Sequence, residues 1–209
     1  MSINWLNGPI QNSQASELLT MSRLNWGRAS TLPSDYQLRS AYPEDLSQLG
    51  ELLLTSFYPE HRFNRWFYSL MRLGIQEDIK RRLKTSSSQY DCLVVVNQAA
   101  GSQIVGTVEI SLRSQFLQPL QPRRPYVANV AVESHHRRRG LAQQMLLACE
   151  SISQTWGFKQ LYLHVATDNP SAIALYQKVG YHVCEQPLPW RRRQMMVKEL
   201  FFQRPDELI

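Results

Sequence analysis

The chain has 209 residues, of which 43% are hydrophobic and 19% charged, so it can form one ordinary domain with a real core plus an extension. No apolar run approaches the roughly 18 residues of a membrane-spanning helix, and the first residues lack the apolar stretch of a secretory signal. We therefore expect a cytoplasmic protein without membrane association, whose net charge of +6 favours anionic partners such as phosphate-bearing cofactors.

Residues 1–34 are polar, rich in Ser and Asn, and show no sustained periodicity, so we interpret them as an N-terminal extension. Their Arg and Ser residues, with Glu17 as the one acid, weakly resemble an organelle transit peptide. A plastid location is therefore the alternative to the cytoplasm.

From Tyr36 onward the pattern becomes regular and predicts a strand, two helices and a hairpin. Residues 36–41 alternate like a half-buried strand, and the following Pro43-Glu44-Asp45 has the early proline and first-turn acids of a helix start. Apolar residues line one face of this helix at Leu46, Leu49, Leu53 and Leu54, and a second helical stretch at residues 61–83 carries Phe63, Trp66, Phe67, Leu70 and Met71. Two β-rich runs, 91–96 and 103–112, enclose a loop with Gly101 and predict a hairpin.

The second half of the chain begins, after a proline-rich connection, with a strand at residues 126–132 that we expect to be buried on both faces. We predict a helix from Arg139 to about Trp156, a strand at 159–165, a short helix at 170–179, and strands at 181–184 and 194–200. These elements predict a single α+β domain, close to α/β, with a mixed central sheet of about seven strands flanked by helices. We place it at residues 35–201 and treat 202–209 as a C-terminal tail.

The three cysteines, Cys92, Cys149 and Cys184, lie far apart and form no CxxC pair. This spacing argues against a disulfide framework and against a zinc site, and we expect no bound metal. Each lies in an apolar stretch, so we predict buried free thiols.

One segment carries more chemical information than the rest. Directly after the strand at 126–132, a short turn and the run Arg137-Arg138-Arg139-Gly140-Leu141-Ala142 open the long helix. A helix N-terminus exposes unpaired backbone N–H groups and the positive end of the helix dipole, and a glycine there lets a ligand approach the backbone closely. The segment therefore predicts a pyrophosphate-binding site.

These residues resemble the acetyl-CoA signature of the GCN5-related N-acetyltransferase (GNAT) superfamily, in which Arg or Gln is followed by two residues, Gly, one residue, and Gly or Ala. A second block about thirty residues later, Asp168-Asn169-Pro170-Ser171-Ala172-Ile173-Ala174-Leu175-Tyr176-Gln177-Lys178-Val179-Gly180-Tyr181, resembles the Asn, Ala, Leu-Tyr and Gly-Tyr pattern of the same superfamily. Both blocks stand in the order and at the spacing of that superfamily. The resemblance covers roughly residues 36–200 and implies an acetyl-CoA-dependent N-acetyltransferase with acetyl-CoA as substrate.

The resemblance also implies where acetyl-CoA lies. The pyrophosphate would sit on the backbone amides at about Arg138–Gln143, and the pantetheine arm would pair with the strand residues Val130, Ala131 and Val132. The implied cofactor-contacting residues are Arg137, Arg138, Arg139, Gly140, Leu141, Ala142 and Gln143 in the turn, with Asn169, Ser171 and Tyr176 in the second block. Asn169 before Pro170 also fits a helix N-cap, and the two roles are compatible.

Transfer of an acetyl group from a thioester to an amine needs a base for the amine and an acid for the leaving thiolate. In the superfamily the amine attacks directly in a ternary complex, so no cysteine nucleophile is needed. By family position the Tyr176 hydroxyl points at the sulfur of CoA, and we predict that Tyr176 is the general acid. The alternative is a core aromatic residue with its hydroxyl at the edge.

The general base is harder to assign, because the strand at 126–132 contains no acid. His164, with Tyr126 on the preceding strand fourteen residues before Gly140, resembles the Tyr and His pair that acts through water in NatE-type N-α-acetyltransferases. Strand alternation places Tyr162 and His164 on one face and Leu161, Leu163 and Val165 on the other. A structural histidine is the alternative, and Glu109 is a further candidate base.

Histidine has an ordinary pKa of about 6.5, and an α-amine near 7.8 is roughly one-tenth neutral at pH 7, whereas lysine is neutral only about once in several thousand. We therefore predict a protein or peptide acceptor, mainly an N-terminal α-amine and secondarily lysine. A small amine such as a polyamine is an alternative, but Glu60 is the only acid in the expected groove wall, Phe57–Arg72. A non-catalytic CoA-binding module is the third possibility. We do not expect a nucleic-acid partner, and monomer and homodimer both remain open.

Overall fold

The computed structural model describes residues 32–57, 65–84, 89–114, 122–185 and 192–201. The expected extension at 1–34 and the tail at 202–209 lie almost wholly outside these ranges. The elements in chain order are β1 (Tyr36–Ser40), the short 3-10 helix η1 (Pro43–Asp45), α2 (Leu46–Phe57), α3 (Arg65–Lys84), β2 (Tyr90–Asn97), β3 (Gln103–Arg113), β4 (Arg124–Val132), η3 (Ser134–His136), α4 (Leu141–Thr155), β5 (Gln160–Ala166), α5 (Pro170–Lys178), β6 (His182–Glu185) and β7 (Arg193–Glu199).

The strands form one seven-stranded sheet in the order β1-β2-β3-β4-β5-β7-β6. The pairing between β4 and β5 is parallel, and the other pairs in this sheet are antiparallel. The chain crosses from β4 to β5 through α4, as a parallel pair requires. The predicted α+β domain with a mixed sheet of about seven strands is confirmed.

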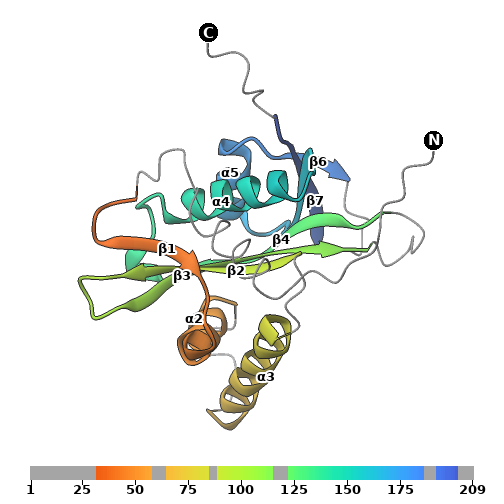
Figure 1. Cartoon of the computed structure of the whole chain (residues 1–209). Coiled ribbons are helices and arrows are strands. Elements are labelled where there is room, and N and C mark those ends of the chain that lie inside the picture. Colours follow the sequence, from red (N-terminus) through yellow and green to blue (C-terminus); the bar gives the residue numbers. More distant parts are fainter. Residues whose placement is uncertain (1–31, 58–64, 85–88, 115–121, 186–191, 202–209) are drawn as a thin grey trace, which may run out of the picture. The chain divides into compact units, whose positions relative to one another are not determined.

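Helices cover both faces of this sheet, with α2 and α3 on one face and α4 and α5 on the other (Figure 1). Apolar residues of α2, among them Leu49 and Leu53, pack with Cys92 and Val94 of β2 in one buried cluster. On the opposite face, Met145 and Leu146 of α4 are fully buried. Helices α2 and α4 therefore each bury one apolar stripe against the sheet, as the 3.6-residue periodicity predicts.

The parallel strands β4 and β5 are paired over a short length only. They pair at Tyr126–Tyr162 and Val127–Leu163, and no further pair joins β4 to β5 in the described residues. On its other edge β4 remains paired with β3 as far as Val132. One edge of Val130–Val132 is therefore left unpaired by β5.

A β-bulge lies where β4 leaves β5. Thr107 pairs with Ala131 and Glu109 with Ala128, so two residues of β4 stand opposite Val108 alone. The first of them, Asn129, has a φ of 51° in the left-handed region, which asparagine tolerates better than most residues. Residues 128–130 are only partly buried, so the expected burial of this strand on both faces is wrong for its middle part.

Two further expectations are corrected. Cys184 is exposed, whereas Cys92 and Cys149 are buried as predicted, because Cys184 lies on β6 at the edge of the sheet. Leu70 was expected on the apolar stripe of its helix, but it is 53% exposed, and Leu73 is 56% exposed. Among the described side chains of α3, Ile79 in the second half of the helix packs into the core.

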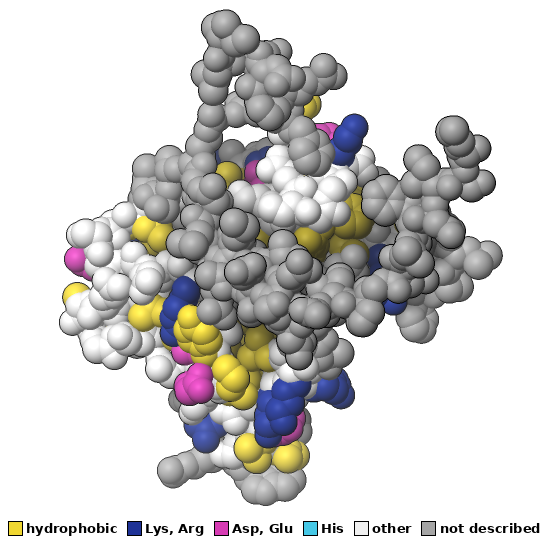
Figure 2. Space-filling model, viewed as in Figure 1, with side chains coloured by type: hydrophobic (Ala, Val, Ile, Leu, Met, Phe, Trp, Pro, Cys, Tyr) yellow, Lys and Arg dark blue, Asp and Glu magenta, His cyan; other side chains and the backbone are white. Residues whose placement is uncertain are grey.

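The basic residues of α3 are largely paired with acids on the same helix. Lys80 contacts Glu77, and Arg81 contacts Asp78. In Figure 2 the lower region, over α2 and α3, shows basic, acidic and apolar side chains close together. This helix therefore presents a mixed, solvated surface, which is the ordinary role of such a charge cluster.

Candidate active site

The turn between β4 and α4 has an unusual backbone that keeps several amides available. Arg138 and Gly140 have φ values of 63° and 79°, and Gly140 is the N-cap of α4. The predicted helix start at Arg139 is therefore two residues early. The backbone N–H groups of residues 138–143 have no hydrogen-bond partner within the described ranges. A row of such donors at a helix N-terminus binds anions.

The three arginines of this turn are exposed, and two of them are anchored. Arg137 Nε donates to the Val132 carbonyl at 2.9 Å. Arg139 Nη1 donates to the Tyr36 hydroxyl at 2.9 Å, and that hydroxyl also meets His136 Nδ1 at 2.9 Å. Arg138 forms no hydrogen bond or ion pair with a described residue, which leaves its guanidinium available for an anion.

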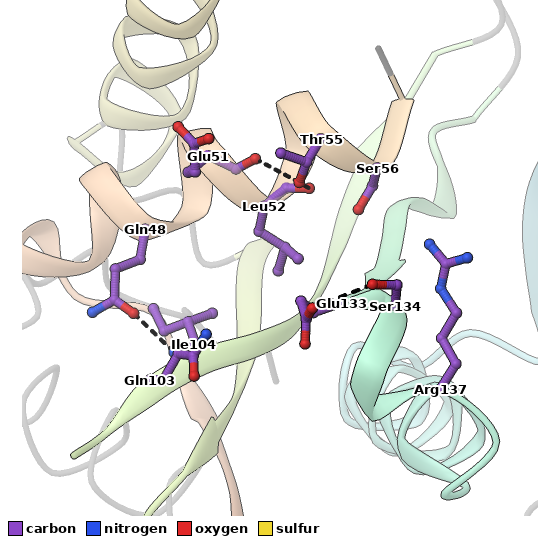
Figure 3. Close-up of a pocket in the computed structure, with 10 residues that line it drawn as sticks. All are labelled: Gln48, Glu51, Leu52, Thr55, Ser56, Gln103, Ile104, Glu133, Ser134 and Arg137. Atoms are coloured by element: carbon purple, nitrogen blue, oxygen red, sulfur yellow. Dashed lines mark hydrogen bonds between the residues drawn. The ribbon is translucent and has the colours of Figure 1, made fainter. Parts of the chain in front are cut away.

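A cavity of about 440 Å³ adjoins the outer side of this turn (Figure 3). It lies between α2, the start of β3 and the turn that follows β4. Its lining residues are Gln48, Glu51, Leu52, Thr55, Ser56, Gln103, Ile104, Glu133, Ser134 and Arg137. The predicted catalytic residues Tyr126, His164 and Tyr176 are not among these lining residues.

Tyr126 and His164 come together on the face of the sheet that carries α2 and α3. Their rings stack with centroids 5.3 Å apart, and the Tyr162 ring also stacks with the Tyr126 ring, at a centroid distance of 6.1 Å. The Tyr126 hydroxyl donates to Met195 Sδ at 2.9 Å. Tyr126 is buried and His164 is exposed, so a solvent-borne amine or water can reach the imidazole.

Arginines lie on the same face next to these rings. The guanidinium of Arg113 is 5.8 Å from the centre of the Tyr126 ring, and that of Arg124 is 5.2 Å from the centre of the Tyr162 ring. Glu199 is linked to the Tyr162 hydroxyl through Gln160. Burial raises the pKa of Tyr162, and the nearby Arg124 opposes this shift. Among the described residues, two guanidinium groups therefore lie against the tyrosine rings beside His164, and the carboxylate of Glu199 is held by Gln160.

Tyr176 lies on α5, on the opposite face of the sheet from this pair (Figure 1). Its side chain is 7% exposed and meets the Tyr181 ring edge-on at 6.0 Å. Burial raises the pKa of Tyr176 to about 12. The phenol therefore stays protonated at neutral pH, as a proton donor must.

Asn169 and Ser171 open α5. The Asn169 side-chain oxygen accepts from the Ala172 amide at 3.1 Å and Pro170 occupies the first helical position, so the predicted N-cap is present. The cap occupies the side-chain oxygen of Asn169 and leaves its NH₂ group for other partners. Ser171 is exposed on the first turn.

Glu109, the further candidate base, is held by partners on both oxygens. It is 1% exposed, its Oε1 accepts from Asn129 Nδ2 at 2.6 Å, and its Oε2 accepts from Arg82. A base must have a lone pair within reach of the amine it deprotonates. This carboxylate is almost wholly shielded from solvent and is bonded on both oxygens, so its position favours a structural role.

The sequence pattern described as "Acetyltransferase (GNAT) family" matches residues 48–181, which is most of the described domain. The chain belongs to the GNAT family. GCN5-related N-acetyltransferase 10, chloroplastic, of Arabidopsis thaliana is 28% identical over 155 residues, covering 66% of this chain and 60% of the relative. An N-alpha-acetyltransferase of Saccharolobus solfataricus is 26% identical over 151 residues, covering 70% of this chain and 80% of the relative.

Among solved structures, the PaiA N-acetyltransferase of Thermoplasma acidophilum in complex with coenzyme A superposes with a TM-score of 0.62 at 19% identity, over 78% of this chain and 98% of that one. This likeness shows the GNAT fold. The chain spans between about one-third and 60% of the length of the first Arabidopsis relatives it matches. Those relatives are named chloroplastic, and for this chain both the cytoplasmic and the plastid location stay predictions.

Two features of this GNAT domain were not predicted from the sequence. The face of Tyr162 was predicted but its stacking on Tyr126 was not, and Asn129 forms a bulge where the strands part. An asparagine within a β-rich run is a signal for a bulge, because asparagine is depleted in strands and tolerates the left-handed region. No comparable signal marks Tyr162, since a tyrosine on a strand is ordinary. Within the described ranges, no helix is long and apolar enough to cross a membrane, and no group of acids, histidines and cysteines could hold a metal ion.

Proposed function

We propose that this GNAT protein transfers the acetyl group of acetyl-CoA directly to an amine, and that the amine belongs to a protein, mainly as an N-terminal α-amine. The observation that carries the proposal is the opening between β4 and β5. It joins the unpartnered amides of residues 138–143 to the unpaired edge of Val130–Val132. The pyrophosphate fits the first set of donors and the amide-rich pantetheine arm fits the second.

We call this opening between β4 and β5 the acetyl-CoA slot. Acetyl-CoA bound in this way would have its thioester at the end of the slot where the two strands come together. His164 is the first residue of β5 beyond the last pair with β4, so it borders the slot from the face of α2 and α3. Tyr176 approaches from the face of α5. In this proposal the base and the acid approach the thioester from opposite faces of the sheet.

In this mechanism the amine nitrogen attacks the thioester carbonyl carbon, and His164 accepts a proton from the amine through water, with Tyr126 orienting the imidazole. The tetrahedral intermediate then collapses with cleavage of the C–S bond. Tyr176 donates its proton to the leaving thiolate and is restored from solvent. The products are the acetylated amine and CoA.

The charge around His164 favours a protein acceptor over a polyamine. Arg113 and Arg124 stack over tyrosines beside His164, and this basic environment opposes the binding of a polycation. A protein N-terminus carries at most one positive charge at the reacting end. Of the expected groove wall, residues 58–64 lie outside the described residues; the two arginines belong to β3 and β4.

A small-molecule acceptor is the second candidate, because one relative is a spermine acetyltransferase by name. The "Probable spermine N(1)-acetyltransferase" of Bacillus subtilis subsp. natto is 26% identical over 98 residues, which cover 46% of this chain and 64% of the relative. That activity needs anionic groups to hold the substrate. The described surface around His164 offers arginines instead.

The test is CoA release from acetyl-CoA with three acceptors: peptides with free N-termini, the same peptides with blocked N-termini, and spermine. We expect turnover on free N-termini, little on blocked lysine-free peptides, and little on spermine. Arg113→Glu should raise activity on spermine relative to peptide about threefold, whereas Lys178→Glu, the same charge change on the opposite face, should not. Greater kcat/KM for spermine than for every free peptide in the wild-type enzyme would refute the protein acceptor.

A further inference from the structure

We propose that Arg82, Glu109 and Asn129, which we call the Glu109 network, hold the β4 bulge in the shape that acetyl-CoA binding needs. This inference rests on the proposed function, because it assigns a role at the same acetyl-CoA slot. The three residues are positioning residues. They contact the strand that binds the substrate and do not touch the reacting atoms.

The bulge stands at the branch point of the sheet. The last pair between β4 and β5 is Val127–Leu163, and Asn129 follows two residues later in the left-handed region. The unpaired edge of Val130–Val132 begins directly after it. A bulge adds one residue to a strand, so its loss would shift the register of 130–132 by one and turn their side chains and amides to the opposite sides.

The conformation of Asn129 is stabilised by a buried charge. Glu109 is 1% exposed, so its carboxylate needs partners to offset the loss of hydration. Asn129 Nδ2 donates to Oε1 at 2.6 Å, and Arg82 donates to Oε2. Only the NH₂ side of the amide can face a carboxylate, so this contact fixes the rotamer of Asn129 as well as its position.

Arg82 connects this network to α3. It lies in the last turns of the helix, where a cation complements the helix dipole, and it also pairs with Asp78 one turn earlier. Its side chain is 32% exposed, so it spans from solvent to the buried carboxylate. The network therefore ties a helix on one face of the sheet to the strand that borders the cofactor slot.

The hydrogen bond from Asn129 to Glu109 can be weakened by single substitutions and restored with the donor and acceptor exchanged, which tests the role of the Glu109 network. Asn129→Asp keeps the size of the side chain and its tolerance of positive φ, but it places two carboxylates against each other. Glu109→Gln alone leaves one of its two partners poorly matched, since a single amide oxygen cannot serve both Arg82 and Asn129. In the double variant Glu109→Gln/Asn129→Asp, the new amide oxygen at position 109 faces Arg82, and its NH₂ group faces the new carboxylate at position 129. Both bonds are then restored, and the one between positions 109 and 129 has reversed polarity.

We expect isothermal calorimetry with acetyl-CoA to give about tenfold weaker binding for Asn129→Asp, a smaller loss for Glu109→Gln, and a return to within about threefold of wild type for the double variant. In steady-state assays the change should fall on the KM for acetyl-CoA, with kcat nearly unchanged at saturation. Thermal unfolding of each variant shows whether it is folded. If Asn129→Asp does not fold, the double variant compared with Glu109→Gln carries the same test.

Two results would overturn the inference. One is a folded single variant that binds acetyl-CoA as tightly as wild type. The other is a folded double variant that binds no more tightly than its single parents. Failure of the proposed function is distinguishable from both, since in that case the wild-type protein itself would give no binding heat with acetyl-CoA.

Discussion

The two halves of the proposed active site are made of different parts of the chain. The cofactor half consists of main-chain groups, namely the amides of 138–143 and the edge of Val130–Val132, shaped by residues with positive φ. The acceptor half consists of side chains, with Tyr126, Tyr162 and His164 stacked on one face and Tyr176 buried on the other. Main-chain donors survive most substitutions, whereas a side-chain acid or base is lost with a few atoms. The two halves should therefore respond very differently to mutation.

The largest effect is expected from the loss of one side-chain oxygen in the acceptor half. Tyr176→Phe removes the proposed acid, and kcat should fall by between about a hundredfold and ten-thousandfold. Binding of acetyl-CoA, measured by calorimetry, should change little, because the ring remains. Because burial raises the pKa of Tyr176 to about 12, the wild-type rate should show no loss from this group below about pH 11. Full activity of the Phe variant would remove Tyr176 from the mechanism.

The cofactor half should fail when its backbone is disturbed. Gly140→Glu places a side chain at a φ of 79° and a negative charge beside the pyrophosphate. The strain favours a relaxed turn that must be bent back on binding, and the charge repels the pyrophosphate; together they should weaken binding by about 3 kcal/mol, or about a hundredfold in Kd. Gly140→Ala is the matched control, since it carries the backbone strain alone and should lose only about tenfold. Equal binding by Gly140→Glu and wild type would exclude this turn as the pyrophosphate site.

A smaller effect is expected at the proposed base. His164→Ala should lower kcat/KM about tenfold near pH 7, because an α-amine is already roughly one-tenth neutral there. A base must be deprotonated to act, so the wild-type rate should fall as pH decreases through the imidazole pKa. The variant should lose this part of the acidic limb of its pH–rate profile. An acidic limb of the same shape in both enzymes would assign the base elsewhere.

The smallest effect is expected for a side chain in the cofactor half. Arg138→Gln removes an exposed cation but leaves the amides in place, so the KM for acetyl-CoA should rise only about two- to fivefold. The difference from wild type should shrink at high salt, because exposed charges are screened. A hundredfold loss with Arg138→Gln would show that side chains, and not the main chain, hold the pyrophosphate.

The same contrast explains what could be predicted from the sequence. The pyrophosphate turn depends on a glycine with positive φ and a helix start, both of which leave a local pattern at 137–142. The strands and helices follow local periodicity, so their order and approximate bounds were predictable. The Tyr126–His164 contact joins two strands that are separated in sequence by the whole of α4. No local pattern predicts it, and only the resemblance to NatE-type enzymes suggested the pair. Tyr162 and the Glu109 network depend on strand register, which no local pattern contains.

The hydrogen bonds of the Tyr36 hydroxyl determine how far the N-terminus of the domain can be shortened without disturbing the turn before α4. Tyr36 is the first residue of β1, yet it meets both His136 and Arg139 in the turn that precedes α4. The start of β1 is thus hydrogen-bonded to the proposed pyrophosphate-binding turn, about a hundred residues later in the sequence. Any processing or truncation that removes Tyr36 would remove both hydrogen bonds from the turn. The affinity for acetyl-CoA should then differ between chains cut before and after this residue.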